Sequence, residues 1–126
     1  MINTDKALPG WKKATIPYQY PDLRRSLWQI ANSLIPFFIL FYLMYRSLDI
    51  SYWLTLALAI PAGGFLVRIF IIFHDCCHGS FFKSQRANRI VGYITGILTF
   101  TPYDRWKHDH SIHHATAGDL DRRGVG

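Results

Sequence analysis

The histidines of this 126-residue chain are gathered in two short clusters. All six follow residue 73, at His74, His78, His108, His110, His113 and His114. On a helix, positions four apart share a face, and so do positions spaced i, i+3 and i+4. Each cluster can therefore aim its imidazoles to one side, which surface or core histidines seldom do by chance. We predict a metal site in which five aligned histidines take part: His74, His78, His110, His113 and His114.

The other residue types narrow the kind of metal site. The chain has eight acidic residues, and all of them are Asp. The absence of Glu excludes the His-Glu-x-x-His zinc peptidase and the Glu-x-x-His di-iron bundle. Imidazole suits zinc, copper, iron and nickel, but a single zinc ion needs only three or four ligands. Five aligned histidines favour two metal ions, and a site without carboxylate bridges beside apolar helices suits oxygen chemistry on a lipid chain.

Two uncharged segments precede the first histidine cluster, at residues 27–45 and 50–67. At about 1.5 Å per residue, such a segment reaches roughly 28 Å on a helix, which is enough to cross a bilayer. We predict a hairpin of two membrane spans, 27–45 and 50–68, with Ser26 as the N-cap of the first. Arg68 is expected to reach toward the lipid head groups while its helix continues beyond it. Core helices of a soluble protein are the less favoured alternative, because the two segments follow each other directly.

Basic residues predict the orientation of this hairpin. Residues 1–26 carry five basic and two acidic residues, and the chain after residue 73 carries seven basic and five acidic residues. The positive-inside rule then places both parts in the cytoplasm, so the basic charge indicates a membrane flank rather than a nucleic-acid surface. Residues 1–26 contain three prolines and are expected to form an extended arm. No signal peptide is expected, because no small-residue cleavage site follows the first span.

A third apolar segment, residues 90–103, is too short to span a membrane comfortably. Basic residues flank both of its ends, so it is expected to be interfacial or re-entrant. Gly92 and Gly96 have a spacing that can admit a close helix contact, although simple packing is the favoured explanation for one such pair. The predicted fold is an all-α membrane protein: a transmembrane helical hairpin, an interfacial or re-entrant helix, and cytoplasmic histidine-bearing helices within residues 74–126.

The two histidine clusters, the hairpin before them and residues 117–126 together resemble the membrane fatty acid desaturase family. The likeness is strongest to bacterial acyl desaturases of the delta-12/omega-6 type, and it covers essentially the whole chain. The resemblance implies an integral protein of the bacterial inner membrane, holding two iron ions and using O2 as co-substrate. It also implies a fatty acyl substrate linked to lipid, coenzyme A or a carrier protein, and an electron donor such as ferredoxin. The family's first two histidine boxes match His74, His78, His110, His113 and His114, which are its expected iron ligands.

The resemblance also implies roles for neighbouring residues. His108 stands where relatives often have a residue that is not a ligand, and Trp106 matches a common family position or anchors the chain at the membrane interface. Asp75 and Asp109 are candidates to orient nearby imidazoles, with a solvated or capping role as the alternative. Cys77 replaces the Gly that relatives usually have, and its thiol is expected to fill space rather than to bind metal.

The family carries a third histidine box beyond a second membrane hairpin, and residues 1–126 contain no counterpart of it. We therefore expect these residues to be the N-terminal part of a desaturase domain and to be inactive alone. Two alternatives remain open. One is a hydroxylase or carotenoid ketolase of the same superfamily, which would use the same ligands. The other is a truncated membrane protein that binds metal without catalysis.

Overall fold

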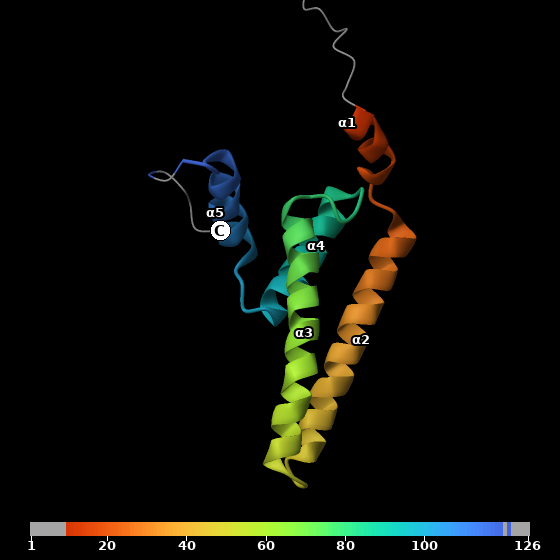
Figure 1. Ribbon diagram of the computed structural model, residues 1–126, viewed down its shortest axis with the longest axis vertical. Helices are drawn as coiled ribbons and strands as arrows, with labels where there is room; N and C mark the ends of the chain where they lie inside the picture. Colours follow the sequence, from red (N-terminus) through yellow and green to blue (C-terminus); the bar gives the residue numbers. More distant parts are fainter. Residues whose placement is uncertain (1–9, 120, 122–126) are drawn as a thin grey trace, which may run out of the picture.

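The computed structural model describes residues 10–119 and 121, and every regular element in them is a helix. The elements are α1 (Gly10–Thr15), the 3-10 helix η1 (Ile16–Tyr18), α2 (Leu23–Ser47), α3 (Tyr52–Cys77), α4 (Gln85–Leu98) and α5 (Tyr103–Ala115). The two long helices α2 and α3 lie side by side as a hairpin, and α4 and α5 gather near the far end of α3 (Figure 1). The predicted all-α fold is confirmed.

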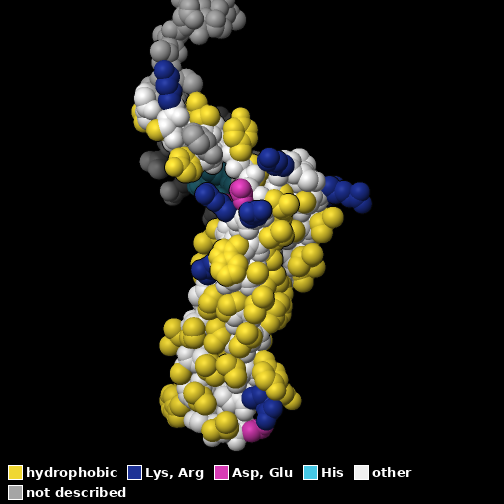
Figure 2. Space-filling view, turned by 90° about the vertical axis from the view of Figure 1, so that its right-hand side faces the viewer, with side chains coloured by type: hydrophobic (Ala, Val, Ile, Leu, Met, Phe, Trp, Pro, Cys, Tyr) yellow, Lys and Arg dark blue, Asp and Glu magenta, His cyan; other side chains and the backbone are white. Residues whose placement is uncertain are grey.

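Both α2 and α3 are long and apolar enough to cross a membrane. Large apolar side chains point outward along them, including Phe41, Trp53 and Ile60. Figure 2 shows hydrophobic side chains over most of this elongated part, with Lys and Arg mainly at its two ends. A soluble monomer rarely exposes a continuous apolar surface of this size. The surface of the hairpin therefore has the character of one that faces hydrocarbon.

The start of α2 differs from the prediction. Asp22 is the N-cap, and its carboxylate accepts a hydrogen bond from the Arg25 N–H at 2.9 Å. Ser26 is buried inside the first turns, where its hydroxyl donates to the Phe81 carbonyl oxygen at 2.7 Å. The prediction of Ser26 as the cap was wrong because the partner of this hydroxyl lies far away in the chain. The extended arm was also wrong for residues 10–18, which are helical, while residues 1–9 lie outside the described part.

The second long helix continues well past Arg68, as predicted, and ends only at Cys77. Arg68 does not extend freely toward head groups. Its Nη2 donates to Asn32 Oδ1 at 2.6 Å and its Nε donates to Ser33 Oγ at 3.3 Å. The guanidinium therefore ties α3 to α2, and the extension beyond it carries the first histidine cluster.

The third apolar segment is divided between two helices. α4 runs back alongside the upper part of α3, and the turn at Thr99–Pro102 reverses the chain into α5 (Figure 1). Phe100, at this turn, has a φ of 54° and is 92% exposed. This reversal returns the chain to the end of α3, so that α5 lies beside the first histidine cluster.

Asn88 holds the loop between α3 and α4 in place. Its side chain is 1% exposed. Its Oδ1 accepts a hydrogen bond from the Phe82 N–H at 2.8 Å, and its Nδ2 donates to the Phe82 carbonyl oxygen at 2.9 Å. Both polar groups of a buried loop residue are therefore paired by one side chain.

Replacing Asn88 by Ala should destabilise the fold by roughly 2 kcal/mol, because it leaves buried backbone groups without partners. Thermal unfolding in detergent, followed by circular dichroism, should show a lower midpoint for this variant. The control is Arg86→Ala, at an exposed position of the same helix. Equal midpoints for the two variants would show that the Phe82 bonds do not stabilise the loop.

Candidate metal centre

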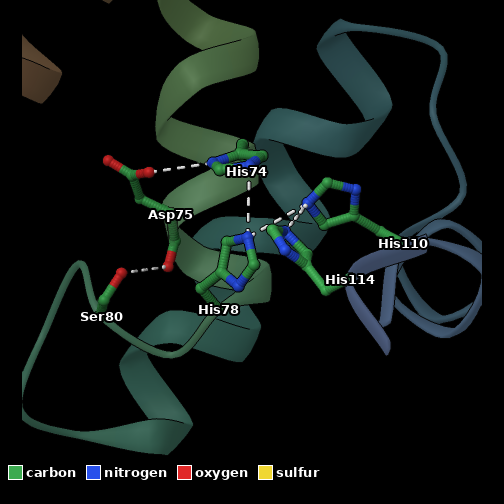
Figure 3. A network of polar contacts seen from close by, with 6 residues as sticks. All are labelled: His74, Asp75, His78, Ser80, His110 and His114. Carbon is green, nitrogen blue, oxygen red and sulfur yellow. Dashed lines mark hydrogen bonds and ion pairs between the residues drawn. The ribbon is translucent and has the colours of Figure 1, made fainter. Parts of the chain in front are cut away.

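Four histidines from two helices converge at the end of α3 (Figure 3). His74 lies in the last turn of α3 and His78 is its C-cap, while His110 and His114 are one turn apart on α5. One ligand atom from each lies within 4.8 Å of the others. His78 Nε2 is 3.2 Å from His74 Nε2 and 3.1 Å from His110 Nε2. His110 Nε2 is also 3.0 Å from His114 Nε2, so each helix contributes two imidazoles to one space.

The donor set of this group fits a transition metal. Among the described residues, the group contains imidazoles and no carboxylate. Such a set favours zinc, copper, iron or nickel over magnesium or calcium, which prefer oxygen. Burial, followed by the charges of neighbouring histidines, lowers the pKa of His78 and of His110 from the ordinary value. A lowered pKa keeps these rings neutral near pH 7, which is the form that binds metal.

His113, the fifth predicted ligand, lies outside this group of four. Its ring centroid is 5.9 Å from that of His110 and 5.9 Å from that of His114. The side chain is half-buried on α5, close to the cluster. The structure thus brings four of the five predicted residues together, and the role of His113 as a ligand stays a prediction.

The two aspartates beside the clusters differ in their contacts. Asp75 Oδ1 lies 3.0 Å from His74 Nδ1, so it can hold the proton on that nitrogen and leave Nε2 free to face the other rings (Figure 3). Asp75 therefore occupies the orienting position that we considered for it. Asp109 instead lies 3.8 Å from Arg105 Nε, in an exposed pair one turn apart on α5.

Cys77 and His108 both lie outside the group of four histidines. Cys77 is buried in a cluster with Phe73 and Tyr103, which fits the space-filling role expected for its thiol. His108 is exposed on α5. Its backbone carbonyl oxygen accepts a hydrogen bond from the Ser111 hydroxyl at 2.6 Å. His108 therefore has the surface position that we considered for it.

Aromatic side chains join the two histidine-bearing helices. Trp106 stacks on His110 with 4.2 Å between ring centroids, and it also meets Phe73 at 5.1 Å. Tyr103 is buried, and its hydroxyl donates to the Cys76 carbonyl oxygen at 3.3 Å. Tyr103 was not among the predicted site residues, because it stands at the end of an apolar segment. Its i, i+3, i+7 spacing with Trp106 and His110 is the signal that places all three on one helical face.

Two glycines of α4 make room for this arrangement. A Cβ atom at Gly92 would overlap the Tyr103 ring, with Cδ2 at 2.7 Å. A Cβ atom at Gly96 would lie 2.7 Å from the Thr101 carbonyl oxygen and 3.0 Å from Phe73 Cε2. The two glycines therefore do admit close contacts. The contact at Gly92 fixes the position of Tyr103, which is the first residue of α5.

Comparison with known proteins gives consistent matches. The family model described as "Fatty acid desaturase" matches residues 51–124, which include both histidine clusters. A "Fatty acid desaturase" of Bacillus subtilis is 58% identical over 114 residues, covering 90% of this chain and 32% of the relative. An "sn-1 acyl-lipid omega-3 desaturase (ferredoxin)" of Synechocystis is 29% identical, covering 90% of this chain and 35% of the relative.

An "Oleoyl-12-hydroxylase" of Ricinus communis is 36% identical over 81 residues, covering 64% of this chain and 21% of the relative. No solved structure matches the chain. The chain spans about a third of the length of the first two relatives. Because the family match covers more than half of the chain and includes both histidine clusters, this chain belongs to the fatty acid desaturase family.

Proposed function

We propose that this chain forms part of a membrane di-iron enzyme that introduces a double bond into a fatty acyl chain, with O2 as the co-substrate. The observation that carries the proposal is the convergence of four imidazoles from α3 and α5 within a family match. The names of the Bacillus and Synechocystis relatives support a fatty acyl substrate. The word ferredoxin in the Synechocystis name supports a small iron–sulfur protein as the electron donor.

The residues that would hold iron are His74, His78, His110 and His114, with His113 as the further predicted ligand. Bound iron would supply the redox chemistry that dioxygen needs to act on an unactivated carbon chain. Asp75 would keep the proton on His74 Nδ1 so that the Nε2 lone pair stays available. Trp106, which contacts both His74 and His110, would cover one side of the centre and limit the access of water there.

We also propose that the histidine clusters lie on the cytoplasmic side of a bacterial inner membrane. The support is the excess of basic residues on both sides of the two uncharged segments, in residues 1–26 and after residue 73. The outward apolar surface of α2 and α3 would then face hydrocarbon, and the metal centre would lie where α3 leaves it. An acyl chain could reach such a centre from within the bilayer.

The proposed function can be tested with a chimera in which this chain replaces the matching third of the Bacillus relative. In a host lipid analysis, the chimera should produce acyl chains with a new double bond, and the 126-residue chain alone should produce none. His113→Ala in the chimera should abolish the product without preventing membrane insertion, whereas His108→Ala should retain it. Retained turnover in His113→Ala would remove His113 from the site.

A hydroxylase is the second candidate, because the Ricinus relative carries that name at 36% identity. Mass spectrometry of the same lipids separates the two reactions, since a hydroxyl or keto product would contradict the desaturase proposal. A chimera that inserts and binds metal but forms neither product would favour a metal-binding protein without catalysis.

A further inference from the structure

Trp106 contacts histidines of the metal centre from both helices. Its indole stacks on His110, with ring centroids 4.2 Å apart and an interplanar angle of 20°. It also meets His74 of α3 edge-on, with 5.7 Å between centroids. One side chain that is not itself in the ligand group therefore contacts one ligand candidate on α3 and another on α5.

α5 depends on few apolar side chains for its attachment to α3. The sequence of α5 is largely polar, and its Ile112 is exposed. Tyr103 and Trp106 are the aromatic side chains through which it meets Phe70 and Phe73 of α3. Aromatic pairs of this kind stabilise a contact beyond the apolar area that they bury. Trp106 therefore helps to set the separation between the two histidine pairs.

The orientation of the His110 ring needs a restraint of its own. A metal-binding histidine is usually oriented by a hydrogen bond from its other ring nitrogen, as Asp75 does for His74. His110 Nδ1 is buried and has no hydrogen-bond partner among the described residues. Besides the contacts of its Nε2 with the other histidines, the flat stack of Trp106 on this ring is a contact that limits its rotation.

We propose that Trp106 is a positioning residue of the metal centre, which restrains the His110 ring and holds α5 against α3 so that both histidine pairs face one ion. The inference rests on the metal centre of the proposed function and adds a residue to it. Trp106 acts through His110 and His74 and does not itself touch the metal.

The test is a titration of the whole chain in detergent with Co2+, whose visible absorption reports ligand geometry. Trp106→Leu keeps an apolar side chain but removes the flat ring, so its affinity for Co2+ should fall roughly 10- to 100-fold, as for other residues that orient ligands. Its visible bands at saturation should also shift, which a loss of stability alone would not cause. Trp28→Leu is the matched control, because Trp28 lies on α2 and is 69% exposed.

Trp106→Phe should recover most of the affinity while still shifting the bands, because the smaller ring covers less of His110. Wild-type affinity and bands in Trp106→Leu would overturn the proposal. If the Leu variant loses helix content, Trp106→Phe decides: shifted bands in the folded variant support the proposal, and unchanged bands with unchanged affinity overturn it. Failure of the unaltered chain to bind Co2+ would overturn the metal centre itself, and this inference with it.

Discussion

Replacing His110 by Ala should lower the affinity of the chain for Fe2+ or Co2+ by more than ~100-fold, beyond the usual loss for a residue that only orients a ligand. The reason is the central place of this imidazole in the cluster. Its Nε2 lies 3.1 Å from that of His78 and 3.0 Å from that of His114, so it links the α3 pair to the α5 pair. Titration calorimetry under anaerobic conditions, with the chain in detergent, would measure the change.

The matched control for this prediction is His108→Ala on the same helix. His108 is exposed and lies outside the group of converging histidines, so its loss should leave the affinity unchanged. Circular dichroism should show the same helix content in both variants. If the two variants bind the ion equally well, the convergence of imidazoles at the end of α3 is not a metal site.

Among substitutions that add one methyl group to this part of the chain, Gly92→Ala should reduce stability the most. The new Cβ would overlap the Tyr103 ring, with Cδ2 at 2.7 Å and Cζ at 3.2 Å. Overpacking of this kind costs about 1–3 kcal/mol, and relief requires Tyr103 to move together with the start of α5. We therefore expect a lower unfolding midpoint together with weaker Co2+ binding, since α5 carries His110 and His114.

Gly64→Ala in α3 provides the control, because nothing lies within 4 Å of a Cβ at that position. In a helix, Ala is more favourable than Gly by roughly 1 kcal/mol, so this variant should be as stable as the original chain or slightly more so. Gly92→Ala gains the same helix propensity, which makes the comparison direct. Equal midpoints in the two variants would refute the close contact between Gly92 and Tyr103.

The membrane-type helices could be predicted closely because their signal is local. The uncharged, mainly apolar stretches at 27–45 and 50–67 are a property of composition, and α2 contains all of the first while α3 contains nearly all of the second. Their ends were less predictable. The start of α2 depends on Asp22, which accepts the Arg25 N–H, and on Ser26, whose partner Phe81 lies beyond the second long helix. A cap and a long-range hydrogen bond both suit serine, and only the folded chain distinguishes them.

The candidate site also has one part that could be predicted from the sequence and another that could not. Helical periodicity pairs His74 with His78 and His110 with His114, because these relations lie within one turn. The meeting of the two pairs is a tertiary event. It requires the reversal at Thr99–Pro102 and the close approach of Tyr103 to Gly92.

The sequence by itself determined the helical class, the apolar hairpin and the residues with metal-binding chemistry, since periodicity and composition act over short distances. The tertiary structure alone decided which four imidazoles share one space, and it placed His113 beside that group rather than within it. The physical reason is that these outcomes depend on side-chain direction at the contact between α3 and α5, where Trp106 and Tyr103 pack against Phe73.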